Sequence, residues 1–159
     1  MKKDAVIDPT GLYRYSLCRE WNTNTPRVAF IMLNPSRADA TTDDPTLRRC
    51  ISFAQSWGYG SLEVVNLFAY RASDPRDLKK VKDDPVGEEN DRYLKEAVER
   101  ADKIIVAWGN RGILNNRYKA VLNMLNGLGG IQLYCLGTTK KSHPYHPLYV
   151  KGNTQPVNY

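Results

Sequence analysis

Cysteine and histidine are scarce in this chain of 159 residues, which has three cysteines and two histidines. The cysteines Cys18, Cys50 and Cys135 are far apart, so no C-x-x-C pair is available for zinc or an iron–sulfur cluster. An odd number of cysteines behind an N-terminus without a secretion signal is typical of reduced thiols, and we expect a cytoplasmic protein. We expect no metal site and no other cofactor.

Long apolar runs are also absent. No stretch of about 18 apolar residues occurs, which argues against a transmembrane helix and a membrane partner. Apolar residues make up 42% of the chain and charged residues 25%, which is typical of a globular protein and not of a disordered or fibrous one. The length suits one domain spanning residues 1–159, and we expect a monomer.

Several familiar catalytic motifs are missing. The chain has no G-x-x-x-x-G-K-[ST] and no G-x-G-x-x-G, so a standard loop for nucleotide phosphates is excluded. It has no G-x-S-x-G nucleophile elbow, and it lacks the zinc signature of the deaminases. The function must therefore be sought in less familiar arrangements of polar residues.

The chain carries an uneven excess of positive charge, with a formal net charge of +6. Residues 74–103 hold 10 acids and 8 bases, whereas residues 137–159 hold three lysines and no acid. A basic surface favours a polyanionic partner, so we expect salt-sensitive binding of nucleic acid (DNA) or a nucleotide through the C-terminal segment. Ordinary solubility charge is the alternative interpretation.

Short apolar runs alternate with amphipathic segments along the chain. The runs suit strands covered on both faces, and the alternation predicts an α/β fold, a three-layer α/β/α sandwich with a mostly parallel central sheet. A further strand of mixed polarity is expected at residues 12–21. The expected parallel strands are residues 27–33, 62–67, 104–108 and 131–136, and the expected helices are residues 45–57, 88–101 and 113–126.

Polar side chains follow the ends of these strands. In an open parallel sheet, ligands bind beyond the carboxyl ends of the strands. We therefore expect four side chains to line one pocket, namely Asn34, Ser36, Asn66 and His146. The alternative is that Asn and Pro in these positions simply form turns. Similarly, the nearby Asp39, Asp43 and Asp44 could hold a metal, but Asp44 is explained more simply as a helix N-cap before Pro45.

Four motifs spread over nearly the whole chain resemble a bacterial and phage family, domain of unknown function 1643. They are Leu33-Asn34-Pro35-Ser36-x-Ala38-Asp39, Asp44-Pro45-Thr46, Asn66-Leu67-Phe68-Ala69-x-Arg71 and Pro144-Tyr145-His146-Pro147-Leu148-Tyr149. This family resemblance implies no established reaction.

The order of motifs within residues 27–150 also resembles the uracil-DNA glycosylase superfamily, more loosely. Residues 28–36 are similar to its first motif, a strand that ends in an Asp-Pro or Asn-Pro loop and positions water. Residues 64–67 and 103–110 resemble the next two strands, and His146-Pro147-Leu148 resembles the late His-Pro motif with its DNA-intercalating loop. The resemblance implies a uracil-DNA glycosylase-like fold and hydrolysis of an N-glycosidic bond.

Roles for individual residues follow from that resemblance. Asn34 would position the water and His146 would stabilise the leaving base. The base would be bound by Ser36, Asn66, Phe68 and Tyr70, the phosphates by Lys140, Lys141 and Lys151, and the duplex would be wedged by Leu148 or Tyr149. The chain departs from the pattern at Asn34, because the most active uracil enzymes have Asp there and an amide is a poor base.

Three functions remain open at this point. The first is a glycosylase-like hydrolase acting on a base, possibly modified, in DNA or in a related nucleoside. The second is a catalytically inactive module that binds nucleic acid or a nucleotide. The third is a base-modification enzyme that uses the same pocket.

Overall fold

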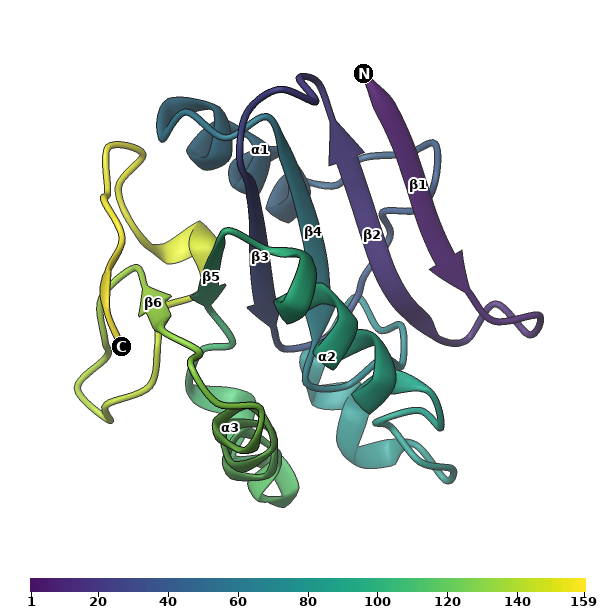
Figure 1. Cartoon of the computed structure of the whole chain (residues 1–159). Coiled ribbons are helices and arrows are strands. Elements are labelled where there is room, and N and C mark those ends of the chain that lie inside the picture. The colour runs from purple at the N-terminus through teal and green to yellow at the C-terminus, as the bar shows by residue number, and fades with distance from the viewer.

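A seven-stranded sheet runs through the protein in the order β1-β2-β4-β3-β5-β6-β7, as the computed structural model of residues 1–159 shows (Figure 1). Neighbouring pairs among β4, β3, β5 and β6 are parallel. The pairs at the two edges are antiparallel. The strands are β1 (Lys2–Ile7), β2 (Arg14–Glu20), β3 (Arg27–Met32), β4 (Ser61–Asn66), β5 (Lys103–Val106), β6 (Leu133–Cys135) and β7 (Val157–Asn158).

The four strands expected from apolar runs are present as β3, β4, β5 and β6, and all four are parallel. The sheet as a whole is mixed, however, because three of its six neighbouring pairs are antiparallel. The expectation of a mostly parallel sheet therefore holds for the centre alone. Neither β1 nor β7 was expected: β1 is mostly exposed and starts with charged residues, and β7 has only two residues, so neither has an apolar run to reveal it.

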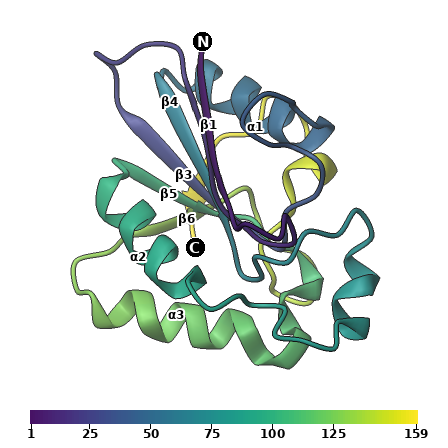
Figure 2. The ribbon, with the colours of Figure 1, turned by 90° about the vertical axis from the view of Figure 1, so that its right-hand side faces the viewer.

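Helices cover both faces of the sheet. Helix α1 (Pro45–Ser56) lies on one face, and α2 (Asn90–Arg100) and α3 (Arg117–Gly127) lie on the other (Figure 2). Asp44 caps α1 as expected, since its carboxylate accepts the Leu47 N–H at 2.8 Å. None of the helices combines the length and the apolar character that crossing a membrane requires.

The third helix begins later than the sequence pattern indicates. The expected helix of residues 113–126 is instead a short 3₁₀ segment, η2 (Asn110–Asn116), followed by α3. Asn115 and Asn116 separate the two, because both have a left-handed backbone with φ values of 54° and 53°. Asn tolerates this conformation better than most residues, so the pair ends one helix and starts another. Two further 3₁₀ segments are η1 (Pro75–Lys80) and η3 (Pro147–Tyr149).

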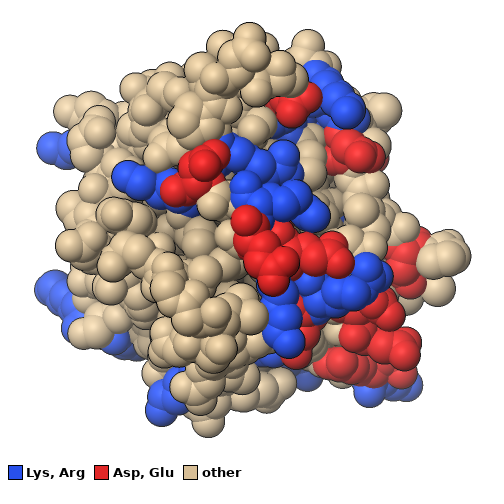
Figure 3. All heavy atoms as spheres, in the orientation of Figure 1, with Lys and Arg blue, Asp and Glu red and all other residues tan.

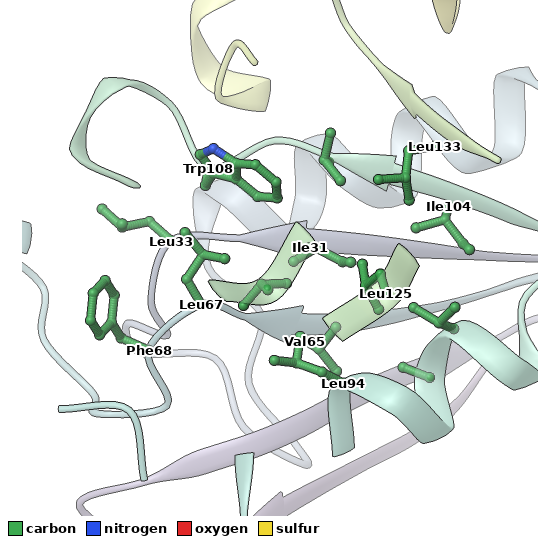
Figure 4. Packing of buried hydrophobic residues seen from close by; sticks show 14 of the residues in the cluster. Ile31, Leu33, Val65, Leu67, Phe68, Leu94, Ile104, Trp108, Leu125 and Leu133 are labelled. Atoms are coloured by element: carbon green, nitrogen blue, oxygen red, sulfur yellow. The ribbon is translucent and has the colours of Figure 1, made fainter. Parts of the chain in front are cut away.

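Alternate side chains of the central strands enter two separate apolar cores. Phe30 packs on the α1 side, whereas its neighbour Ile31 packs on the side of α2 and α3. Figure 4 shows the second core, in which Trp108 and Phe68 lie at the end of the sheet where the parallel strands finish. Because both faces of β3 are covered, its side chains from Val28 to Met32 are all buried. This is the physical reason why the strand reads as one unbroken apolar run.

A buried carboxylate joins several of these elements at the opposite end of the sheet. Glu63 on β4 accepts hydrogen bonds from Ser16 at 2.5 Å, from Arg27 at 2.9 Å and from Arg100 at 2.8 Å. Burial on its own would raise the pKa of Glu63, but these donors outweigh burial and the pKa is lowered. The carboxylate is therefore ionised, and it ties β2, β3 and α2 to β4.

Candidate functional site

An open cleft of about 500 Å³ lies at the carboxyl ends of the parallel strands. The loop after β3 forms one wall, the loop after β5 forms the second, and the segment after β6 forms the third. This is where a ligand is expected in such a sheet. The residues that line the cleft are Leu33, Asn34, Ser36, Thr46, Ala72, Ser73, Pro75, Trp108, Gly109, Asn110, Arg111, Thr139, Tyr145, His146, Leu148 and Tyr149.

A smaller hollow of about 40 Å³, here called the inner pocket, adjoins the cleft. The two hollows share Asn34, Ser36, Thr46 and His146, so these side chains stand at the boundary between them. The inner pocket reaches between the sheet and α1. Its other lining residues are Arg14, Leu17, Met32, Asp44, Leu47 and Val64.

Hydrogen bonds fix the amide of Asn34. Its Nδ2 donates to the Ala72 carbonyl at 2.8 Å and to the Pro35 carbonyl at 3.0 Å. Both partners can only accept, so the nitrogen must face them and the amide cannot be flipped. The Oδ1 atom is therefore the part of Asn34 that remains to accept a hydrogen bond from water or a ligand.

His146 is fixed in a complementary way. Its Nδ1 accepts the Leu148 N–H at 3.2 Å, as the N-cap of η3, so the proton of the neutral ring is on Nε2. Burial lowers the pKa of His146, and the nearby Asp44 opposes this only in part. At neutral pH, therefore, His146 is an uncharged ring that can donate a hydrogen bond from Nε2.

Backbone hydrogen bonds hold the His146 segment against the rest of the site. The Gly109 N–H donates to the Pro144 carbonyl at 2.8 Å, which joins this segment to the loop after β5. The Tyr145 N–H donates to the Gly137 carbonyl at 3.0 Å, which joins it to the end of β6. The His146 segment is thus fixed to the ends of two neighbouring strands, β5 and β6.

A buried arginine stands in the wall of the inner pocket. Arg14 is only 4% exposed, and it donates from Nη1 to the Ala38 carbonyl at 3.0 Å. Its Nε is buried without a hydrogen-bond partner. Burial lowers the pKa of Arg14 to about 10, so the side chain is still positively charged at neutral pH.

Acidic side chains are absent from the lining of the cleft, whereas Arg111 is part of it. A neighbouring hollow of about 380 Å³ shares Pro75, Asn110 and Arg111 with the cleft and adds Lys79 and Lys141. In the view of Figure 3 the acidic side chains gather on the right half of the molecule, on the side of α2. The linings of the cleft and of the adjoining hollow therefore contain basic side chains, namely Arg111, Lys79 and Lys141, and no acidic ones.

Asn66 does not join the other expected pocket residues. It is 2% exposed, and it lines neither the cleft nor the inner pocket. Its side-chain nitrogen and oxygen have no hydrogen-bond partner. The reason is that α2 and α3 cover the end of β4. Asn90 donates to the carbonyls of Asn66 and Leu67, and Arg117 donates to the carbonyl of Leu67 at 2.8 Å.

Phe68 and Tyr70, which were expected to bind the base, also lie outside the cleft. Phe68 has no exposed surface and belongs to the apolar core, as Figure 4 shows. Tyr70 packs edge to face against Tyr13, with the ring centroids 5.7 Å apart. Neither side chain is placed to stack on a ligand in the cleft, where the aromatic side chains are instead Trp108, Tyr145 and Tyr149.

The expected nucleic-acid contacts are exposed but scattered. Lys140, Lys141 and Lys151 are all exposed, and of these Lys141 lines the hollow next to the cleft. Leu148 and Tyr149 are 45% and 78% exposed, and both line the cleft. They are apolar side chains presented to solvent at its edge.

The remaining histidine, His143, is buried and packs edge to face against Tyr118 with the ring centroids 5.1 Å apart. It lines neither the cleft nor the inner pocket. Its position against α3 agrees with a structural role.

The acids after β3 hold that loop in place. Asp44 accepts the N–H groups of Leu47 and Ala38, and Asp43 accepts the Arg19 Nε at 3.0 Å. Asp39 accepts two backbone N–H groups of its own turn. No group of three or more His, Cys, Asp or Glu side chains comes together with the spacing that a metal ion needs.

The site residues predicted from the sequence did not include Arg14, Thr46, Trp108 or Arg111. The positions of Trp108 and Arg111 after the third parallel strand could have assigned them to the site. A charged residue in a strand of otherwise mixed polarity gave no such signal for Arg14, because its burial depends on the distant loop that it contacts.

Comparisons with known proteins identify the family. A family model described as "Protein of unknown function (DUF1643)" matches residues 14–148. No curated protein and no solved structure gives a match, so the looser resemblance to uracil-DNA glycosylases stays a prediction. The family model covers most of the chain, including every residue that lines the inner pocket and all those that line the cleft except Tyr149, and the protein therefore belongs to the DUF1643 family.

Proposed function

We propose that the protein is a glycosylase-like hydrolase that cleaves the N-glycosidic bond of a base in DNA or in a related nucleoside. One observation carries the proposal. The fixed acceptor Asn34 Oδ1 and the fixed donor His146 Nε2 belong to side chains that line the same cleft and the same inner pocket. Hydrolysis of such a bond needs these two functions, one for the water and one for the leaving base.

The reaction assigns each atom a role. A water hydrogen-bonded to Asn34 Oδ1 adds its oxygen to the anomeric carbon of the sugar as the bond from that carbon to the base nitrogen breaks. The electron pair of the broken bond leaves with the base, and the Nε2–H of His146 stabilises the negative charge that develops there. The proton lost by the water is taken up by the departing base, since an amide is a poor base.

A neutral histidine suits this role. A neutral ring that carries its proton on Nε2 can stabilise developing negative charge without a change of its protonation state. The hydrogen bond that Leu148 N–H donates to Nδ1 keeps the ring in this tautomer. The lowered pKa of His146 agrees with this state.

The cleft has the dimensions and walls that the proposal requires. About 500 Å³ lies within the usual range of small-molecule sites, and Tyr145 and Tyr149 supply aromatic surface for a base outside the stack. Leu148 and Tyr149 are apolar and exposed at the edge, where they would enter the gap left in a duplex. A uracil-DNA glycosylase-like arrangement of the α/β fold is part of this proposal.

The second candidate is a module that binds nucleic acid or a nucleotide without chemistry. It is favoured by one observation, the absence of any carboxylate from the lining of the cleft. Such a site can bind a polyanion, but it contains no carboxylate that could act as a general base on water.

A direct assay separates the two candidates. The protein is incubated with a panel of oligonucleotides and nucleosides that carry normal, deaminated, oxidised and alkylated bases. Base release is detected as alkali-labile abasic sites in the oligonucleotides and as free base from the nucleosides. Release from at least one substrate supports the hydrolase, whereas binding without release from any of them supports the binding module.

A further inference from the structure

The inner pocket has the features of a ligand site in its own right. Arg14 is almost wholly buried in its wall, it forms no ion pair within 4 Å, and its Nε has no hydrogen-bond partner. The Nε itself is out of reach of a ligand, but a buried cation without an ion pair costs free energy, so the charge of Arg14 beside an open pocket indicates that an acceptor group of a ligand completes it.

Besides Arg14, three side chains of the pocket wall can donate hydrogen bonds, and the N-terminus of a helix adds positive charge. Thr46 and Leu47 belong to the first turn of α1, whose N-terminus is the positive end of the helix. Ser36 and Thr46 contribute hydroxyl groups, and His146 contributes Nε2–H.

Asp44 is the acid in the pocket wall, and its carboxylate is already engaged. Its Oδ1 accepts the Leu47 N–H at 2.8 Å and its Oδ2 accepts the Ala38 N–H at 3.2 Å. Asp44 therefore moderates the charge of Arg14 from a distance without using the donors of the guanidinium.

The size of the pocket limits what can enter. The inner pocket, at about 40 Å³, is far smaller than the cleft of about 500 Å³ that it adjoins. It therefore suits the edge of a ligand whose body lies in the cleft, and a carbonyl oxygen on a flat ring is such an edge.

We propose that the inner pocket binds an oxo group on the edge of the substrate base and that Arg14 is the residue that selects it. This inference rests on the proposed function. Arg14 can only donate hydrogen bonds, so an oxygen of the base can accept from it. An amino group in the same place would face the guanidinium with a second donor, and no hydrogen bond would form. When the base leaves with the electron pair of the glycosidic bond, its oxygen carries part of the negative charge, and the buried cation stabilises that charge.

A purely structural role for Arg14 is the competing explanation. Arg71 holds the same loop, by donating to the carbonyls of Ser36 at 3.4 Å and Arg37 at 3.5 Å, but it lines neither hollow. Arg71→Gln is therefore the matched control for Arg14→Gln, since both substitutions weaken the loop and only one changes the pocket.

The test is the binding of free bases to the whole protein, measured by calorimetry. Hypoxanthine and uracil carry oxo groups, and adenine carries an amino group and no oxygen. We expect wild type to bind hypoxanthine about 10- to 100-fold more tightly than adenine, which is the usual effect of one hydrogen bond to a charged group. The Arg14→Gln variant should lose this preference, because its binding of hypoxanthine and uracil should weaken while its binding of adenine should not. The Arg71→Gln variant should keep the preference.

Three outcomes would overturn the inference: equal binding of hypoxanthine and adenine by wild type, equal loss in Arg14→Gln and Arg71→Gln, or Arg14-dependent binding of inorganic phosphate. Should Arg14→Gln fail to fold, Arg14→Lys keeps the charge but loses the planar donor group, and it should reduce the preference. Because binding of a free base needs no bond cleavage, the result is independent of whether the protein releases a base.

Discussion

Hydrogen bonds with the backbone determine what Asn34 and His146 can offer to a ligand. The Asn34 nitrogen donates to two backbone carbonyls, and the His146 Nδ1 accepts one backbone N–H. What remains is one acceptor and one donor at the boundary of the cleft and the inner pocket. These backbone contacts determine the proposed chemistry. A flipped Asn34 amide would offer a donor in place of the acceptor, and the other tautomer of His146 would offer an acceptor in place of the donor.

Substitution of these two residues should affect the rate of base release more than binding. We expect His146→Ala and Asn34→Ala each to lower the single-turnover rate by roughly 10²–10³, the usual cost of losing one group that acts in the transition state. Affinity for the unreacted oligonucleotide should change little. The control is His143→Ala, which should retain most of the rate. A His146→Ala variant that loses thermal stability and DNA affinity together, with no separate effect on rate, would assign the residue to the loop alone.

The pH dependence should report the protonation of His146. Its folded pKa lies below the usual 6.5, so between these two values the unfolded state binds more protons than the folded state. The contribution of His146 to stability is therefore complete above about pH 6.5 and is lost as the pH falls through the lower folded pKa. We expect the rate to be steady near neutral pH and to fall over the same acidic range, since a charged ring cannot accept the Leu148 N–H.

Melting temperatures of wild type and His146→Gln, measured from pH 8 to pH 5, check this expectation. The difference between the two curves should narrow as the pH falls below about 6.5, because Gln does not titrate. A difference that is constant or grows on acidification would contradict the lowered pKa.

At the scale of whole elements, the first turn of α1 organises the site. Asp44 caps the helix and also accepts the Ala38 N–H, so one carboxylate fixes both the helix and the loop after β3. That loop carries Asn34 and Ser36, and the helix carries Thr46.

Removal of this cap should therefore lower both stability and ligand binding. We expect Asp44→Ala to reduce the free energy of unfolding by about 1–2 kcal/mol, which is the upper part of the range for a lost N-cap. Chemical denaturation measures the change. The matched control is Asp74→Ala, which removes the side-chain cap of the exposed segment η1 and should have a smaller effect. Equal effects of the two substitutions would show that the contact with the loop contributes nothing.

Elements with a strong local pattern could be predicted from the sequence, and those that depend on distant contacts could not. The strand β3 and the start of α1 follow from an unbroken apolar run and from Asp44-Pro45. The edge strands β1 and β7 become strands because of their neighbours, not because of their own composition.

The same distinction applies to the site. Asn34, Ser36 and His146 follow strand ends that remain open, and the structure brings them together. Asn66 and Phe68 follow a strand end that α2 and α3 cover, through hydrogen bonds from Asn90 and Arg117. Nothing in the local sequence around Asn66 indicates that these side chains would be buried.

At the scale of the whole molecule, the linings of the cleft and of the hollow beside it contain basic side chains and no acidic ones. The lining of the cleft has no acid, and Lys79, Arg111 and Lys141 border the hollow beside it. Of the ten acids in residues 74–103, Asp74 and Asp77 lie at η1 beside the hollow, and the other eight follow η1, in or near α2. Long-range attraction would therefore favour a strand of nucleic acid that enters along the cationic side.

Binding of an oligonucleotide should accordingly weaken with salt. The logarithm of affinity should fall with the logarithm of salt concentration, with a slope near −0.9 for each phosphate neutralised on duplex DNA and near −0.7 on a single strand. Arg111→Ala should make the slope shallower by the amount expected for about one phosphate contact. Lys151 lines neither the cleft nor the hollow beside it, so Lys151→Ala should change the slope less. Titrations at several salt concentrations provide the slopes. Affinity that does not respond to salt would point to a small uncharged ligand.

Single-turnover base release from the oligonucleotide and nucleoside panel is the decisive measurement of whether the cleft cleaves an N-glycosidic bond. Wild type and His146→Ala are compared side by side, with protein in excess over substrate. The account predicts that wild type releases at least one kind of base and that His146→Ala releases it roughly 10²–10³ times more slowly. The account is contradicted if wild type binds members of the panel and releases no base from any of them, or if the two proteins release base at the same rate.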